Sequence, residues 1–382
     1  MARAAAIPTI LIAIALLEAR TASAVDHVLM RRGGQEATVS GRLMVTAKDG
    51  GLLILTPDGT LQAVQPDEIV KHTSDELPFR ALAADELARQ LIPKLPTGFE
   101  SYTTAHYLIL HDTSREYAAW CGALFERLHR GFTNYWSRKG IDLREPEFPL
   151  VALVFADRQA YVQFSQEEVG KAADAIIGYY SLRTNRITMY DLTGTDALRQ
   201  PGERRSTAAQ INRLLARPEA EQTVATVIHE ATHQIAFNSG MQVRFSDTPL
   251  WVSEGIAMYF ETPDLQSSKG WSTIGAINYA RLAKFRESLP TRTPGSLSSL
   301  LADDKRVRDP RLALDAYAEA WALSYYLSQR HPKEYLAYLQ MLAAKPQLVW
   351  DTPETRLAEF QSTFGDLGKL DADFVRQMSK LK

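Results

Sequence analysis

The segment His229-Glu230-Ala231-Thr232-His233, with the pattern HExxH, constrains this chain more than any other feature. Residues four apart lie on one face of an α-helix, so a helix here would bring both imidazole rings to a single point. The neighbouring sequence favours a helix, because no Pro or Gly lies between Pro218 and Gly240. An apolar stripe at helical spacing supports the same conclusion. It consists of Val224, Val227, Ile228, Ala231 and Ile235.

Glu230 lies between the two histidines in sequence, but it is too far round the helix to join them as a metal ligand. It is free to take a proton from a water molecule on the metal, which is the role of a general base. The alternative is a surface helix that carries the pattern by chance.

A third ligand is expected at Glu254, within the apolar segment 249–257, with twenty residues between it and His233. Catalytic zinc sites use three protein ligands and leave one position for water. A carboxylate in apolar surroundings is costly without a partner. The sequence therefore predicts one zinc ion per chain, held by His229, His233 and Glu254. The alternative for Glu254 is a helix residue in an ordinary salt bridge.

These two segments together, HExxH and Trp251-x-x-Glu254-Gly255-x-Ala257, resemble the gluzincin zinc metallopeptidases of the peptidase-MA-like superfamily. More broadly, residues 107–261 resemble a family of exported bacterial proteins with a peptidase-MA-like domain of unassigned function. The resemblance implies a zincin-like fold and hydrolysis of a peptide bond by zinc-activated water, with Glu230 as general base.

The sequence departs from the gluzincin pattern at two places. It lacks the Gly-x-Met-Glu-Asn segment with which aminopeptidases capture a substrate amino terminus. Thermolysin-like enzymes have a carboxylate four residues after the third ligand, where this chain has Met258. A carboxylate that orients a zinc-bound histidine must therefore come from elsewhere, and Asp247 is the candidate.

Two further features are candidates for the site. Tyr317 begins a predicted helix and resembles the post-ligand tyrosine of related enzymes, which would support negative charge on the carbonyl oxygen. The alternative for Tyr317 is a packing role. Residues 178–181 and 186–190 are predicted strands, expected at the sheet edge beside the motif helix, where an extended substrate would pair. The alternative is an ordinary core hairpin.

The start of the chain, residues 1–24, has the pattern of a signal peptide. Arg3 precedes an apolar run over 7–17, and Ala22-Ser23-Ala24 has the small residues needed for cleavage. The run is shorter than the ~20 residues needed to span a bilayer. The sequence therefore predicts export to the periplasm or the extracellular space, with no stable membrane span after cleavage.

The fold class expected is α+β. Residues 25–73 are predicted to form four strands in a small barrel-like β module, with hairpin turns at Asp49-Gly50 and Asp58-Gly59. Residues 74–100 are predicted to be a linker with one short helix near 84–92. Residues 101–382 are predicted to be a zincin-like catalytic domain with a mixed sheet, sheet-rich over 101–195 and helical over 206–382. Within it we expect a strand at 102–110, a helix at 113–139 and a buried strand at 149–155.

Composition limits the partners. The net charge of −2 argues against a nucleic-acid partner, which usually requires a basic surface. The single cysteine, Cys121, cannot form an internal disulfide, and its apolar helical surroundings predict a buried thiol. The β module is expected to pack on the rest of the chain or to bind an envelope partner.

The function expected from the sequence is that of a secreted zinc-dependent hydrolase, specifically a peptidase acting on a peptide or protein. A rival within the same chemistry is cleavage of another bond, such as a cell-wall peptide amide. The rival from another class is a catalytically silent, zinc-stabilised binding or scaffold protein of the cell envelope.

Overall fold

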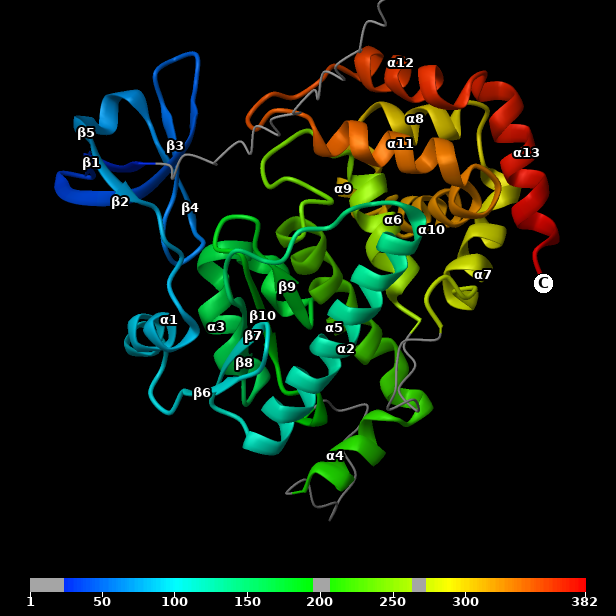
Figure 1. The fold of residues 1–382 in the computed structure, drawn as a ribbon. Helices are drawn as coiled ribbons and strands as arrows, with labels where there is room; N and C mark the ends of the chain where they lie inside the picture. Colours follow the sequence, from blue (N-terminus) through cyan, green and yellow to red (C-terminus); the bar gives the residue numbers. More distant parts are fainter. Residues whose placement is uncertain (1–23, 195–206, 263–272) are drawn as a thin grey trace, which may run out of the picture.

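The computed structural model describes residues 24–194, 207–262 and 273–382. The predicted signal peptide therefore lies outside the described residues, except for Ala24. The described chain is α+β, with an N-terminal β module, a second sheet and a helical C-terminal region (Figure 1). No helix in these three ranges is both long and apolar enough to cross a bilayer.

The β module is an antiparallel sheet with strand order β4-β3-β2-β1-β5. Its core contains Val28, Met30, Leu52, Ile54 and Val64. The predicted barrel-like closure is wrong, because the edge strands β4 and β5 do not pair with each other. Closure is not needed, since the second face of β3 is covered by the rest of the chain. The strands are β1 (Ala24–Arg32), β2 (Gln35–Thr46), β3 (Leu52–Leu55), β4 (Leu61–Val64) and β5 (Ile69–Pro78).

Strand β5 was not predicted, and it continues past the expected module boundary at residue 73. The strand is largely exposed, contains Lys71, Asp75 and Glu76, and ends at Pro78, so it lacks the alternating apolar pattern of a half-buried strand. Pairing with β1 along its length holds it in place.

The second sheet has strand order β6-β7-β8-β10-β9, and the central pairs β7-β8 and β8-β10 are parallel. Both outer pairs are antiparallel, so the sheet is mixed, as predicted. Because successive side chains of β7 and β8 point to opposite faces, each face has its own apolar cluster. The strands are β6 (Glu100–Thr103), β7 (Tyr107–His111), β8 (Leu150–Phe155), β9 (Gly178–Tyr180) and β10 (Arg186–Tyr190).

The single strand predicted at 102–110 is two strands, β6 and β7, which fold back on each other. Glu126 holds the turn between them, because its carboxylate accepts hydrogen bonds from the Thr104 hydroxyl (2.6 Å) and the His106 N–H (2.7 Å). This partner is distant in sequence, so the local apolar pattern did not indicate the turn.

Helices cover both faces of this sheet. Helix α2 (Arg115–Lys139) packs on one face, and helices α1 (Ala84–Leu91) and α3 (Arg158–Val169) pack on the other. The helices predicted at 84–92 and 113–139 are therefore confirmed. Cys121 of α2 is fully buried, as predicted, and burial raises the pKa of its thiol.

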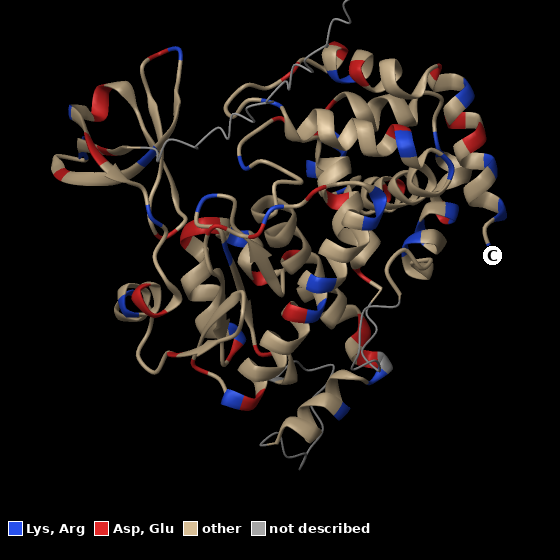
Figure 2. Ribbon diagram, in the orientation of Figure 1, with Lys and Arg blue, Asp and Glu red and all other residues tan. Residues whose placement is uncertain are grey.

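The described chain from residue 207 onward is mostly helical, as predicted from about residue 206, and α12 and α13 lie at the end opposite α4 (Figure 1). Lys and Arg residues are interspersed with Asp and Glu in this region (Figure 2). The helices are α4 (Ala208–Leu215), α5 (Pro218–Asn238), α6 (Leu250–Phe260), α7 (Tyr279–Ser288), α8 (Ser296–Ala302), α9 (Lys305–Arg308), α10 (Ala313–Arg330), α11 (Pro332–Ala343), α12 (Pro353–Phe364) and α13 (Leu367–Lys380).

Gly255 allows α6 to lie directly against α10. A Cβ atom at this position would clash with the Ser324 hydroxyl oxygen and would lie 2.8 Å from the carbonyl oxygen of Ala320. Both groups belong to α10, and the carbonyl is part of the helix backbone. The helix therefore could not move away locally. The glycine beside Glu254 thus has a packing role, and it fixes the depth at which Glu254 is held.

We expect Gly255→Ala to lower the free energy of unfolding by about 1–3 kcal/mol, because it forces extra volume into a closely packed contact. The measurement is chemical denaturation. Gly368→Ala is the matched control, since Gly368 is also helical but a Cβ there meets nothing closer than 3.4 Å. Equal stability of the two variants would contradict the packing role of Gly255.

Candidate functional site

The HExxH residues of helix α5 lie on a face of the helix that is partly exposed to solvent. His229, Glu230, His233 and Phe237 are partly exposed, whereas the predicted stripe Val224, Val227, Ile228, Ala231 and Ile235 is buried. The helix ends where Ser239 is followed by Gly240, whose φ of 80° suits a glycine. The predicted helix over this segment is therefore confirmed.

Polar contacts fix α5 against the second sheet. The Gln234 amide donates to the carbonyl oxygens of Val151 in β8 (3.0 Å) and Asn185 in the β9–β10 turn (2.9 Å). The amides of Asn185 and Asn238 also bond each other in both directions, at 2.7 and 2.8 Å. These hydrogen bonds tie the helix to the β9–β10 hairpin, and β9 is the edge strand beside the motif helix, as predicted.

Helix α6 brings Glu254 to the histidines. The Nε2 atom of His229 lies 3.0 Å from a Glu254 carboxylate oxygen and 3.0 Å from the Nε2 atom of His233. The His233 Nε2 atom lies 3.6 Å from the other oxygen of Glu254. The structure thus brings the three predicted metal ligands together.

These spacings fit a tetrahedral zinc site. With bonds of about 2.0–2.1 Å, neighbouring ligand atoms in such a site lie roughly 3.3–3.5 Å apart. The observed separations of 3.0, 3.0 and 3.6 Å lie close to that range, and the two distances to Glu254 are to different oxygens of its carboxylate. Two imidazole nitrogens and one carboxylate are also a donor set that zinc accepts in catalytic sites.

Glu261 orients His229, and sequence reasoning missed it. A Glu261 oxygen accepts a hydrogen bond from the Nδ1 atom of His229 at 2.8 Å, which leaves the lone pair of Nε2 for a metal. Glu261 in turn contacts Arg281 (3.2 Å) and Asn278 (3.2 Å). Glu261 lies seven residues after Glu254, which is two turns along the same helix face. This spacing in the sequence could have indicated Glu261 as a residue near the histidines.

Asp247 does not orient either histidine, contrary to the expectation from the sequence. Its carboxylate pairs with the guanidinium of Arg356, and it lies 3.7 Å from the Lys345 ammonium. The second histidine is oriented differently, because Nδ1 of His233 lies 3.2 Å from the hydroxyl of Ser253. That hydroxyl donates to Gln242 and can accept from the ring.

Glu230 projects toward the edge strand. One of its oxygens accepts a hydrogen bond of 2.8 Å from the backbone N–H of Tyr180 in β9. Burial raises the pKa of the Glu230 carboxyl, and the nearby His229 and His233 rings partly offset that effect. Glu230 is not one of the three converging groups that could hold a metal ion.

A cavity of about 460 Å³ is lined by His229, Glu230, His233 and Glu254. Tyr180 of β9, Tyr317 of α10 and Trp350 also line it. Burial raises the pKa of Tyr317, and the negative charges of Glu254 and Glu230 raise it further. The structure therefore brings Tyr317 to the same cavity as the HExxH residues, and its phenol is protonated at neutral pH.

Residues 223–348 match a family model described as a protein of unknown function, DUF1570. The matched segment contains the three converging ligands, Glu230, Glu261 and Tyr317. The β module and the whole of the second sheet lie outside it. A comparison with curated proteins finds no match to this chain.

The cluster predicts how stability depends on pH when no metal is bound. Burial alone would lower the pKa of His229, but its hydrogen bonds to Glu254 and Glu261 outweigh burial and raise it. A raised pKa stabilises the fold fully below the unfolded value of about 6.5, and this contribution is lost as pH rises through the folded value. We expect the thermal midpoint of chelator-treated protein to fall as pH rises above 6.5.

The variant Glu261→Gln isolates the contribution of His229 to this pH dependence, because it removes one of the two carboxylates that raise the pKa of His229. We expect its thermal midpoint to change less steeply with pH than that of the unmodified protein. The exposed substitution Glu287→Gln is the control. A chelator-treated protein whose midpoint is constant between pH 6.5 and 9 would contradict this account.

Proposed function

We propose that this chain is a zinc-dependent hydrolase that cleaves peptide bonds, with a zincin-like domain of the gluzincin type. One observation carries the proposal: three ligand atoms, from His229, His233 and Glu254, converge beside an acidic side chain that is not a ligand, at the wall of a cavity. In the proposed enzyme these three residues hold one zinc ion. We further propose that the chain is exported, on the pattern of residues 1–24.

Zinc in such a site would polarise the carbonyl of the substrate and lower the pKa of a water molecule. Glu230 would take the proton from that water and deliver it to the leaving amine. The Tyr180 N–H bond holds the Glu230 carboxylate in place for this transfer. The raised pKa of Glu230 suits a group that must both accept and release a proton near neutral pH.

Tyr317 would donate a hydrogen bond to the carbonyl oxygen as negative charge develops on it. Its position at the cavity and its raised pKa support this role, because a phenol that stays protonated remains a donor. The edge strand β9 would pair with an extended substrate beside the same cavity, which Tyr180 lines, through backbone groups other than the Tyr180 N–H that Glu230 uses.

Two Glu→Gln substitutions are expected to impair different properties, one turnover and the other zinc binding. Glu230→Gln should keep zinc and the fold, because the residue is not a ligand, yet lower turnover by about 10²–10⁴ through loss of the general base. Glu254→Gln should instead weaken zinc binding, because it replaces a charged ligand. The measurements are zinc content of protein purified without added metal, thermal midpoint, and cleavage of a mixed peptide library.

A Glu230→Gln variant as active as the unmodified protein would rule out this mechanism. Protein that binds zinc tightly but cleaves no peptide in the library would favour the zinc-stabilised scaffold instead. A zinc content near zero in the unmodified protein would contradict both functions.

Tyr317→Phe is expected to lower kcat by about 10²–10³, as the loss of an oxyanion donor does elsewhere, with zinc content unchanged. Tyr325→Phe is the matched control, because Tyr325 lies on the same helix but contacts Trp321 and Tyr259 rather than the cavity. Equal kcat values for the two variants would assign Tyr317 a packing role only.

A further inference from the structure

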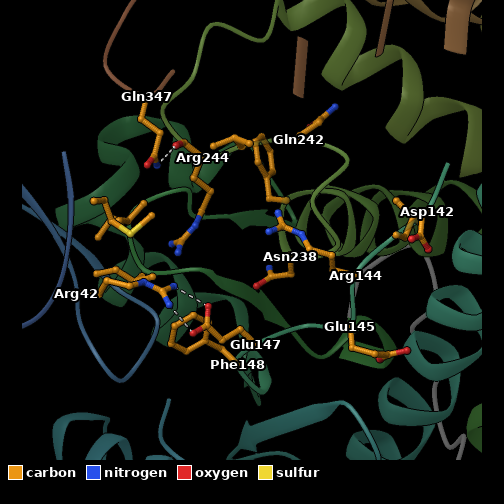
Figure 3. Close-up of a pocket in the computed structure, with 16 residues that line it drawn as sticks. Arg42, Asp142, Arg144, Glu145, Glu147, Phe148, Asn238, Gln242, Arg244 and Gln347 are labelled. Carbon is orange, nitrogen blue, oxygen red and sulfur yellow. Dashed lines mark hydrogen bonds and ion pairs between the residues drawn. The ribbon is translucent and has the colours of Figure 1, made fainter. Parts of the chain in front are cut away.

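A second cavity, of about 730 Å³, adjoins the first (Figure 3). Phe237 and Val243 line both cavities, so the two lie side by side. The β module forms one wall of the second cavity with Arg42, Met44, Leu55 and Leu61. Residues of the segment 142–148 also line it. The mechanism proposed above uses nothing in this second cavity.

Arg244 is the unusual residue of this second cavity, because it is buried without an acidic partner. It is 9% exposed, and its Nη1 atom donates to the carbonyl oxygens of Gly59 (2.9 Å) and Leu182 (3.2 Å). In the described ranges no carboxylate lies within ion-pair distance of it. The nearby Asp58 is bound to Arg186 at 2.7 Å. A buried charge normally has a counter-charge, so the Arg244 guanidinium is a candidate binding group for an anion.

Arg144 adds a second positive charge. Its guanidinium lies over Gly240, where a Cβ atom would come within 2.5 Å of its Nη2 atom, so the glycine leaves the space that the arginine fills. No acidic group within the described residues pairs with it either. Figure 3 shows the guanidinium groups of Arg144 and Arg244 both pointing toward the middle of the cavity.

The other charges of the second cavity do not neutralise these two. Arg42 is already paired with both oxygens of Glu147, at 2.7 and 2.9 Å. The carboxylates of Asp142 and Glu145 point away from Arg244 in Figure 3. The cavity therefore holds two guanidinium groups without an acidic partner among the described residues, the buried one of Arg244 and the exposed one of Arg144. They lie beside the amide of Asn238 and the apolar side chains of Phe237 and Leu61.

We propose that this second cavity is a substrate subsite for a carboxylate, carried by a residue close to the bond that is cut. The inference rests on the proposed hydrolase function and specifies its substrate class as acidic peptides. Guanidinium groups bind carboxylates through paired, charge-assisted hydrogen bonds, and the apolar wall would contact the rest of the residue. A single substrate could reach both sites, because Phe237 and Val243 line the two cavities.

The test uses three pools of hexapeptides randomised over uncharged residues, all acetylated at the N-terminus. The first contains one Gln and has an amidated C-terminus. The second replaces Gln with Glu. The third keeps Gln but has a free C-terminal carboxylate. We expect one acidic pool to be cleaved with a kcat/KM about tenfold above the neutral pool, and which pool it is identifies the source of the carboxylate.

The variant Arg244→Gln should reduce that ratio to below about twofold, whereas Arg244→Lys should retain part of it because the charge remains. The matched control is the double variant Arg31→Gln with Glu36→Gln, an exposed ion pair of the β module whose residues line neither cavity. It removes a charge pair without changing the net charge, and it should keep the ratio. Circular dichroism and the thermal midpoint check that each variant is folded, and Arg144→Gln tests the same subsite if Arg244→Gln does not fold.

A binding measurement separates this inference from the proposed function. The dissociation constants of the three pools are measured by calorimetry on Glu230→Gln protein, with and without Arg244→Gln. Cleavage of all pools at equal rates would overturn the subsite and leave the hydrolase standing. Tighter binding of an acidic pool that Arg244→Gln abolishes, without cleavage by the unmodified protein, would support the carboxylate site and overturn the hydrolase. Neither cleavage nor charge-dependent binding would overturn both.

Discussion

The pairing of His229 with two carboxylates is the interaction on which the candidate site depends. Glu254 contacts one ring nitrogen and Glu261 the other, and all three side chains are largely removed from solvent. Isolated charges in such surroundings would be expensive, so each group requires its neighbours to be in place. The guanidinium of Arg281 forms an ion pair with the Glu261 carboxylate. Helices α5, α6 and α7 are therefore held in one arrangement by charge as well as by apolar packing.

Packing around this cluster sets the positions of its members. Gly255 lets α6 approach α10, and this depth determines where the Glu254 carboxylate lies. On the other side, Gln234 and the Asn185–Asn238 amide pair tie α5 to the second sheet. The base and the ligands of the proposed enzyme thus stand on regular elements rather than on loops, which gives precise geometry.

The β module is part of the same assembly. Leu53, Leu55 and Leu61 pack against Phe148, and the Asp58-Gly59 turn supplies a carboxylate to Arg186 and a carbonyl to Arg244. Gly59 has a φ of 83°, which suits the turn, and a Cβ there would touch the Phe148 ring at 3.4 Å. In the proposed enzyme this module would help select the substrate, because it forms one wall of the carboxylate subsite and anchors its principal arginine.

Local sequence determined the elements whose pattern is self-contained. The HExxH helix, the buried strand β8 and the α2 helix follow from apolar periodicity, and the shared face of His229 and His233 follows from their spacing along the helix. Tertiary structure alone decided the features that depend on distant partners. The turn at residues 104–106 needs Glu126, strand β5 needs β1, and the open β module needs Phe148 to cover β3. Glu261, and not Asp247, accepts the hydrogen bond from His229, because only Glu261 lies close enough in space to do so. The Asp247 carboxylate pairs instead with the Arg356 guanidinium.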